Sequence, residues 1–313
     1  MKAAPVENTL TNNNVFFIVG PTAVGKSQIA VDVARRCGGE VVSADAFQIY
    51  QGLDSLTAKP EREVLEKVPH HLIGTVPLTE EMNAEQFRVA ARDAIAGIRA
   101  RRKPALVVGG SGMYVQALTD GLSALPPADP ELRQRLNHLS EGELFVRLRQ
   151  RDPQTADLID ARNKRRLVRA VEICLLTGRP ASVQRKRDLS AERPHGVLLV
   201  RDREELYDRI NARVEMMFAS GVIEEVREAQ EVSPTAAKTI GLRQVEDLIA
   251  GRLSEAKCKA AIQQATRRYA KRQLTWFQHQ TNFEPLNLSH HGSSEAIEWI
   301  ARKARLSFAQ QDV

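Results

Sequence analysis

Residues 15–27 read Val15-Phe16-Phe17-Ile18-Val19-Gly20-Pro21-Thr22-Ala23-Val24-Gly25-Lys26-Ser27, and this stretch decides the fold. Its second part fits the phosphate-loop pattern G-x-x-x-x-G-K-[ST] at every fixed position. The apolar run before the loop predicts a buried strand, and apolar positions from Ile29 to Cys37 predict a helix after it. Loop N–H groups and the helix N-terminus would then bind a polyphosphate, as in ATP-binding proteins. Lys26 would reach the terminal phosphate, and the Ser27 hydroxyl would face Mg²⁺.

The composition is that of an ordinary globular protein with a basic excess. The chain has 313 residues, of which 42% are hydrophobic and 27% charged, and its formal net charge is +6. A basic balance fits a polyanionic partner such as nucleic acid. The three cysteines lie far apart, which argues against disulfides or a zinc site and favours a reducing cytoplasm. The early apolar run is too short for a signal peptide or a membrane span, so we expect no membrane association.

Two further strands should bring side chains to the phosphate loop. Residues 40–45 read as a strand ending at Asp45, and residues 104–110 as one that runs into glycines before Ser111. Ligands of open α/β sheets bind outside the carboxyl ends of the strands, so Asp45 and Ser111 should lie near Lys26. Asp45 could act as a base or hold Mg²⁺ through water, and a turn or cap aspartate is the alternative. The strand at 104–110 lacks the terminal aspartate that helps ordinary NTPases hold Mg²⁺.

The alternation of strands and helices before Pro126 predicts an α/β fold with a parallel, doubly wound sheet. Three prolines between residues 126 and 130 then mark a boundary. Helices are expected over 131–151 and 163–177, in a basic, helical insertion. The domains are therefore predicted as a phosphate-loop core of residues 1–125 and 194–313, and an insertion of residues 126–193.

Basic side chains cluster at the start of the second insertion helix. Arg162, Lys164, Arg165, Arg166 and Arg169 follow one another with almost no acid beside them. Such a run would repel itself unless an anion lies against it, which favours nucleic-acid contact over a solvated face.

A second basic stretch lies in a long helix near residues 266–277. Arg267 with Lys271, and Arg268 with Arg272, are like-charged pairs four residues apart, which repel each other in an isolated helix. A phosphate or diphosphate ligand would relieve this repulsion. The apolar face of this helix reads as core packing and comprises Ile262, Ala265, Tyr269, Gln273 and Trp276. After Glu284 the sequence carries little structural signal.

In this order the motifs resemble those of the tRNA dimethylallyltransferases, also called tRNA isopentenyltransferases. The resemblance runs from Val15 to Phe277. Besides the phosphate loop it rests on Ser43-Ala44-Asp45, Thr57-Ala58-Lys59-Pro60, Gly109-Gly110-Ser111-Gly112-Met113-Tyr114, Arg166-x-x-Arg169-Ala170-x-Glu172, and Thr266-Arg267 through Thr275-Trp276-Phe277. The phosphate loop is common to many families, whereas the ordered set is specific, above all Ala270-Lys271-Arg272-Gln273-Leu274-Thr275-Trp276.

The resemblance implies a phosphate-loop kinase-like core with a helical insertion, and a tRNA clamped between the two. It implies transfer of the dimethylallyl group from dimethylallyl diphosphate to N6 of the adenosine immediately 3′ of the anticodon, in tRNAs that read codons beginning with U. The product would be N6-(dimethylallyl)adenosine. The flipped adenine and the diphosphate would meet in a channel from opposite ends. Mg²⁺ is the implied cofactor, and we expect a cytoplasmic monomer.

The resemblance also implies roles for individual residues. Asp45 matches the aspartate that accepts a proton from the N6 amine, and Ser111 and Arg267 are the other catalytic candidates. Diphosphate binding is assigned to Gly20, Pro21, Thr22, Ala23, Val24, Gly25, Lys26, Ser27 and Lys271, with Ser27 also the Mg²⁺ candidate. Contacts with tRNA are assigned to Asp45, Ala46, Phe47, Gln48, Ser111, Arg133, Arg165, Arg166, Leu167, Val168, Arg169, Lys238 and Arg243.

The chain departs from the usual family pattern at several positions, none of which removes a charged catalytic group. The family usually has threonine at Ser111, and serine keeps the hydroxyl with weaker rotamer control. The other departures are Ala46 for serine, Leu56 for glycine, Arg162-Asn163 for Asn-Asp, and Leu242 for tyrosine.

Three alternatives remain open. An adenylate dimethylallyltransferase, which modifies free AMP, ADP or ATP, would share the core but would not need the basic insertion. A small-molecule or nucleotide kinase is disfavoured by the missing strand-end aspartate and by the Thr266–Phe277 motif. A non-catalytic RNA-binding protein is disfavoured by the intact Lys26, Ser27 and Asp45.

Overall fold

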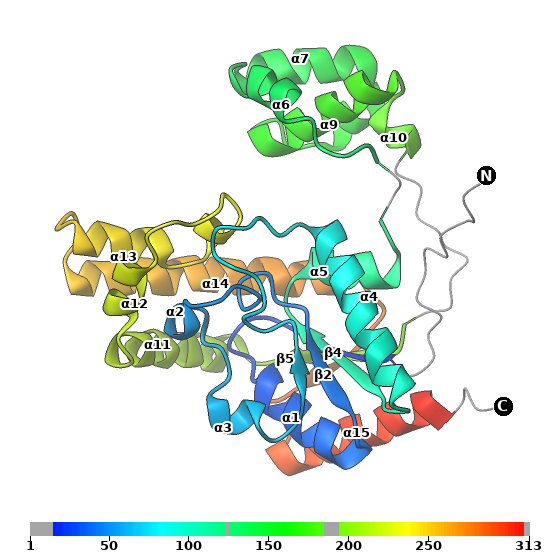
Figure 1. The fold of residues 1–313 in the computed structure, drawn as a ribbon, viewed down its shortest axis with the longest axis vertical. Helices are drawn as coiled ribbons and strands as arrows, with labels where there is room; N and C mark the ends of the chain where they lie inside the picture. Colours follow the sequence, from blue (N-terminus) through cyan, green and yellow to red (C-terminus); the bar gives the residue numbers. More distant parts are fainter. Residues whose placement is uncertain (1–14, 123–124, 185–193, 310–313) are drawn as a thin grey trace. The chain divides into compact units, whose positions relative to one another are not determined.

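The computed structural model describes residues 15–122, 125–184 and 194–309. Its strands form one parallel six-stranded sheet in the order β3-β2-β4-β1-β5-β6 (Figure 1). The strands are β1 Val15–Val19, β2 Glu40–Ser43, β3 His70–His71, β4 Ala105–Gly109, β5 Gly196–Val200 and β6 Glu284–Asn287. The predicted α/β fold with a parallel sheet is therefore confirmed.

The order of the strands brings the predicted site loops together. Strand β4 pairs with β1 on one side, where Val19 lies opposite Gly109, and with β2 on the other, where Ser43 lies opposite Val108. The segments that follow β2, β4 and β1 therefore leave neighbouring strand ends. These segments carry Asp45, Ser111 and the phosphate loop.

The helices of the core surround this sheet. They are α1 Lys26–Cys37, α2 Asp54–Thr57, α3 Arg62–Leu65, α4 Ala84–Ala100, α5 Gly112–Thr119, α11 Arg203–Ala219, α12 Val222–Glu228, the 3₁₀ helix η1 Ala236–Lys238, α13 Leu242–Ile249, α14 Glu255–Gln280 and α15 Ser293–Ala309. Successive side chains of β1 point to opposite faces, as in any strand. Phe16 and Ile18 join the core beneath α1 and α15, whereas Phe17 and Val19 join the core beneath α4 and α5.

A third apolar cluster joins helices α11, α12, α13 and α14 to the short helix α2. Leu53 and Leu56 of the α2 segment pack there with Val214, Val222 and Ile262. Helices from the second half of the chain therefore contact a loop that follows β2 (Figure 1).

The structure divides into two compact units, residues 1–119 with 192–313, and residues 120–191. The sequence placed the insertion at 126–193. The second unit consists of α6 Pro130–Asn137, α7 Glu141–Arg151, α8 Pro153–Leu158, α9 Lys164–Thr177 and α10 Ala181–Gln184. It has its own apolar core, which includes Leu144, Leu148, Leu167 and Val171.

Some predicted element bounds are wrong. The helix expected over 131–151 is two helices, because Ser140 and Glu143 form a capping box that starts α7. Strand β2 ends at Ser43, before Asp45. The sequence after Glu284, which carries little signal, forms β6 and α15.

Glu40, at the start of β2, forms a buried ion-pair cluster. Its carboxylate is 2% exposed and pairs with Arg101, Lys103 and His71 at 2.7, 3.2 and 2.8 Å. Hydrogen bonding to Arg101 lowers the pKa of Glu40 to about 2, despite the opposing effect of burial. The ionised carboxylate therefore stabilises the fold above its unfolded-state pKa, and this contribution is lost as the pH falls toward 2.

We predict that Glu40→Gln lowers the free energy of unfolding at pH 7 by about 2 kcal/mol, since three partners lose their charged acceptor. Urea unfolding at pH 7 and pH 3 would measure it, with the exposed Glu81→Gln as the control. The difference in the free energy of unfolding between Glu40→Gln and wild type should be smaller at pH 3 than at pH 7. An equal difference at both pH values would contradict the assignment.

Candidate active site

The phosphate loop lines a cavity of about 390 Å³ at the carboxyl ends of the strands. Gly25 has φ 106°, a left-handed conformation that suits glycine, and α1 begins directly after it. The Lys26 Nζ donates to the carbonyls of Gly20 and Pro21 at 2.9 and 2.7 Å. Burial lowers the pKa of Lys26 to about 8, although the nearby Asp45 carboxylate opposes this shift. Lys26 is therefore charged at pH 7 and loses its charge as the pH rises through about 8.

This pKa predicts a pH dependence of substrate capture. An anionic diphosphate binds the protonated amine, so affinity is full below about pH 8 and falls as the pH rises through it. We expect kcat/KM for a diphosphate substrate to decline by about tenfold per pH unit above this value. A pH profile of kcat/KM would measure it, and a flat profile to pH 9.5 would contradict the prediction.

Three arginines in and just before α11 donate hydrogen bonds to the phosphate loop. Arg201 donates through Nε to the Val24 carbonyl at 2.9 Å, and Arg209 donates through Nε to the Ala23 carbonyl at 2.8 Å. Arg213 donates to the Thr22 hydroxyl at 3.0 Å and to the Thr57 carbonyl at 2.6 Å. Arg209 and Arg213 also line the cavity.

The sequence reasoning missed these two arginines because it treated α11 only as an amphipathic helix. The available signal was their spacing of four residues, which places two like charges on one helix face, as at Arg267 and Lys271.

Asp45 lies in a turn that its own side chain closes. Its Oδ1 accepts hydrogen bonds from the N–H groups of Phe47 and Gln48 at 2.9 and 3.3 Å. Among the described residues no hydrogen bond to Oδ2 is found, and Asp45 lines the cavity. The turn-aspartate role and a role at the site are therefore compatible, since Oδ1 closes the turn and Oδ2 is left without a bond to any described residue.

Ser111 holds the same loop from β4. Its hydroxyl oxygen accepts from the Ala46 N–H at 2.8 Å, and its own N–H donates to the Ala44 carbonyl at 3.2 Å. Ser111 therefore contacts the backbone on both sides of Asp45, through its hydroxyl at Ala46 and through its own N–H at Ala44. Serine suffices for this bond, as threonine would.

Gln273 joins the phosphate loop to the Ser111 loop. It is 5% exposed, accepts from the Thr22 N–H at 2.8 Å and donates to the Gly110 carbonyl at 2.8 Å. A side chain at Gly110 would lie 2.3 Å from the Gln273 amide, so only glycine fits there. The sequence assigned Gln273 to core packing. It is buried as expected, but the structure adds a polar bridge that helical periodicity could not show.

We predict that Gln273→Leu lowers kcat/KM by about 10- to 100-fold, because a buried N–H and a buried carbonyl lose their partner and the two loops uncouple. Steady-state kinetics and a thermal melt would measure the change. Gln278→Leu, at an exposed position of the same helix, is the matched control. Wild-type kinetics in Gln273→Leu would contradict the bridge.

A second, smaller cavity of about 40 Å³ adjoins Asp45. Asp45, Phe47, Thr239 and Tyr269 are among its lining residues, and the Phe47 and Tyr269 rings lie 6.0 Å apart. Burial raises the pKa of Tyr269, so its phenol remains protonated. The Asp45 carboxylate thus lies between a cationic cavity and one with aromatic walls.

Two other predicted residues lie outside these cavities. Arg267 donates to the Asn211 Oδ1 at 2.6 Å and lies over the Tyr207 ring at 5.1 Å. Lys271 is exposed on α14. Among the described residues that line either cavity, neither Arg267 nor Lys271 appears.

In the second unit the predicted tRNA-binding residues differ in exposure. Arg165 and Arg166 are exposed at the start of α9, whereas the Leu167 and Val168 side chains are buried in the core of the unit. Lys238 and Arg243, which belong to the first unit, are also exposed.

Within this basic run, Arg169 has an acidic partner. Glu172 is fully buried and pairs with Arg133 at 2.9 Å and with Arg169 at 2.6 Å. Burial opposes ionisation of Glu172, but hydrogen bonds from both arginines keep its pKa below the usual value. These two arginines therefore neutralise an internal acid, which lies three residues after Arg169 on the next helical turn.

The oxygen donors at the cavity fit Mg²⁺. The Ser27 hydroxyl and the Asp45 carboxylate both line it, and Mg²⁺ commonly uses one or two protein oxygens together with substrate phosphates and water. No cluster of three or more His, Cys, Asp or Glu side chains that could hold a metal occurs in the described part of the chain. A metal here would therefore depend on the substrate for most of its ligands.

The sheet order, the glycine loop after β1 and the cationic cavity define a phosphate-loop α/β protein with an added helical unit. Residues 48–280 match the family model for IPP transferase, and the chain belongs to this family. A tRNA dimethylallyltransferase 1 of Citrifermentans bemidjiense is 42% identical over 272 residues, which cover 84% of this chain and 88% of that protein.

Solved structures agree with this membership. The full-length tRNA isopentenylpyrophosphate transferase of Bacillus halodurans superposes with a TM-score of 0.70 at 32% identity, over 96% of this chain and all of that one. A eukaryotic dimethylallyltransferase described as acting on tRNA superposes with a TM-score of 0.75 at 25% identity, over 91% of this chain and 78% of that one. Along the part of the chain that the structure describes, no helix has the length and apolar character needed to cross a bilayer.

Proposed function

We propose that the protein transfers the dimethylallyl group of dimethylallyl diphosphate to N6 of the adenosine 3′-adjacent to the anticodon, in tRNAs that read U-first codons. The observation that carries this proposal is the position of Asp45, which lines both the cationic cavity and the smaller aromatic-walled one. The family membership supports prenyl transfer to tRNA.

The larger cavity would bind the diphosphate. Loop N–H groups, Lys26, Arg209 and Arg213 surround the space and would stabilise the charge that develops as the allylic C–O bond breaks. Bound Mg²⁺, held by Ser27, would neutralise further charge on the leaving group. We propose that Arg267 and Lys271 draw the anion toward this site from outside.

The flipped adenine would bind beside Phe47 and Tyr269, where the smaller cavity would widen to admit it. As N6 attacks the terminal allylic carbon, a new N–C bond forms and one amine proton passes to Asp45 Oδ2, while diphosphate departs. An exocyclic amine conjugated to a purine is a poor nucleophile, so this proton transfer matters for the rate. Ser111 and Gln48 would hold the Asp45 turn.

The exposed cations would bind the RNA backbone. Arg165, Arg166, Lys238 and Arg243 are exposed, and phosphate contacts of this kind offset the cost of unstacking a base. Arg133 and Arg169 contribute less, since both neutralise Glu172. We propose that the protein acts on tRNA as a monomer in the cytoplasm.

A transfer assay tests the proposal. The purified protein is incubated with Mg²⁺, radiolabelled dimethylallyl diphosphate and either unmodified tRNA for a U-first codon or free AMP. Label in the tRNA that disappears when the target adenosine is changed to guanosine is the expected result. Label in AMP alone would instead make the protein an adenylate dimethylallyltransferase, and no label in either would overturn prenyl transfer.

A further inference from the structure

Helix α2, four residues long, lies between two strained residues. Leu53 and Ala58 flank it with φ 50° and 45°, the left-handed region that side chains with a Cβ rarely adopt. Leu53 provides no side-chain hydrogen bond to the start of the helix. Other parts of the chain must therefore hold this segment in place.

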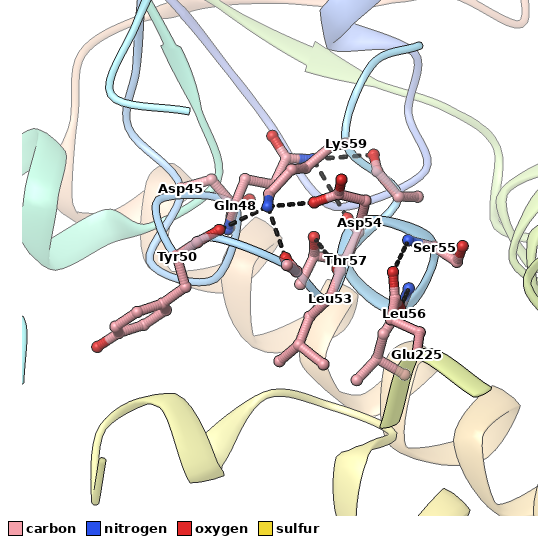
Figure 2. Close-up of polar contacts among 12 residues, drawn as sticks. Asp45, Gln48, Tyr50, Leu53, Asp54, Ser55, Leu56, Thr57, Lys59 and Glu225 are labelled. Carbon is pink, nitrogen blue, oxygen red and sulfur yellow. Dashed lines mark hydrogen bonds and ion pairs between the residues drawn. The ribbon is translucent and has the colours of Figure 1, made fainter. Parts of the chain in front are cut away.

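Glu225 of α12 supplies the missing contact. Its two carboxylate oxygens accept from the N–H groups of Ser55 and Leu56 at 2.8 and 2.9 Å. Figure 2 shows this carboxylate facing the start of α2 from the neighbouring helix. The Ser55 hydroxyl adds a bond to the Ser220 carbonyl at 3.2 Å. A carboxylate at a helix start is the favourable sign of charge.

Lys59, which follows α2, connects the end of the segment back to its start. Its side chain is 7% exposed, and its amine donates to the carbonyls of Tyr50 and Gly52 and pairs with Asp54. Glu225 and Lys59 together therefore hold the strained turn, Glu225 from α12 and Lys59 from the residue that follows Ala58 (Figure 2).

The last turn of α2 contacts both halves of the site. The Thr57 carbonyl accepts from Arg213 at 2.6 Å and from the Gln48 amide at 3.2 Å. Arg213 also binds Thr22 of the phosphate loop, and Gln48 belongs to the turn that Asp45 closes. One carbonyl thus orients a cation of the diphosphate cavity and a side chain next to the proposed base.

We propose that Glu225 is a positioning residue for the transfer reaction. By holding the start of α2, it orients the Thr57 carbonyl and, through that carbonyl, the Arg213 guanidinium and the Gln48 amide. The inference deepens the proposed function and rests on it for its kinetic readout.

The test compares Glu225→Gln with Glu224→Gln, its exposed neighbour on α12, which pairs only weakly with Arg227 at 3.5 Å. Glutamine keeps the size of the side chain but can accept only one of the two bonds. Calorimetric titration with inorganic pyrophosphate should show a dissociation constant raised about tenfold in Glu225→Gln. In Glu224→Gln it should change by less than about twofold.

Kinetics separate positioning from a loss of folded protein. A disordered Arg213 raises KM for dimethylallyl diphosphate, whereas a smaller folded fraction lowers only the apparent kcat. If Glu225→Gln does not fold, Glu225→Asp keeps the charge, withdraws the oxygens by one methylene and should give the same rise. Wild-type pyrophosphate affinity in either folded variant would overturn the inference. The pyrophosphate titration does not need transfer activity, so it decides the inference even if the wild type modifies no tRNA.

Discussion

Replacing Asp45 by asparagine should lower kcat for transfer to tRNA by about 10²–10⁴-fold, the usual contribution of a positioned general base. The Oδ1 of asparagine can still accept the Phe47 and Gln48 N–H bonds, which Asp45 makes through one oxygen at 2.9 and 3.3 Å. The turn should therefore persist. The group that replaces Oδ2 is an amide NH₂, which cannot accept the N6 proton. Single-turnover kinetics with radiolabelled dimethylallyl diphosphate and tRNA would measure the loss.

Two controls accompany Asp45→Asn. A thermal melt should lie close to that of wild type, because the turn hydrogen bonds survive. Filter binding of tRNA should also be retained, because the loop keeps its shape. A rate within about threefold of wild type would mean that Asp45 only shapes the turn and that another group takes the proton.

Local patterns explain how much of this site the sequence could predict. The phosphate loop is contiguous in sequence, so residues 20–27 predict both the strand before the loop and the helix after it. Asp45 lines the cavity and Ser111 contacts the Asp45 turn, because parallel strands share the direction of their carboxyl ends. The Asp45 turn and the Ser140 capping box are likewise local, although the second was overlooked.

Contacts between distant segments could not be predicted in this way. Gln273 meets Thr22 across 251 residues, and Glu225 meets Ser55 across 170. Helical periodicity reports that Gln273 faces inward but not which loop it meets. The ion pair between Arg169 and Glu172, in contrast, is a local contact. Glu172 lies three residues after Arg169, so the sequence could have predicted this i,i+3 pair. The prediction that the whole basic run contacts RNA therefore overestimated Arg169. The exposed Arg165 and Arg166 are the better candidates for RNA contact.

The second large effect is expected at the phosphate-loop lysine. Lys26→Met should lower kcat/KM for dimethylallyl diphosphate by about 10²–10³-fold, since the leaving diphosphate loses a preorganised cation that lies within the cavity. Methionine keeps the length of the stem, so the apolar contacts of the loop survive. The exposed Lys67→Met is the matched control, and its kinetics should be those of wild type. Inorganic pyrophosphate titration should show the same weakening, because it depends on the cavity and not on the prenyl group.

The pH dependence of the residual activity of Lys26→Met tests the role of the amine more sharply than the size of the activity loss does. If the amine with a pKa of about 8 causes the loss of substrate capture at alkaline pH, the variant must lose that dependence as well. Its kcat/KM should then be flat from pH 7 to pH 9, where the wild-type value falls. A decline retained in the variant would assign the ionisation to another group. Because the ordinary pKa of an exposed lysine is 10.5, a midpoint near 8 in the wild type would also locate the titrating amine in a buried site.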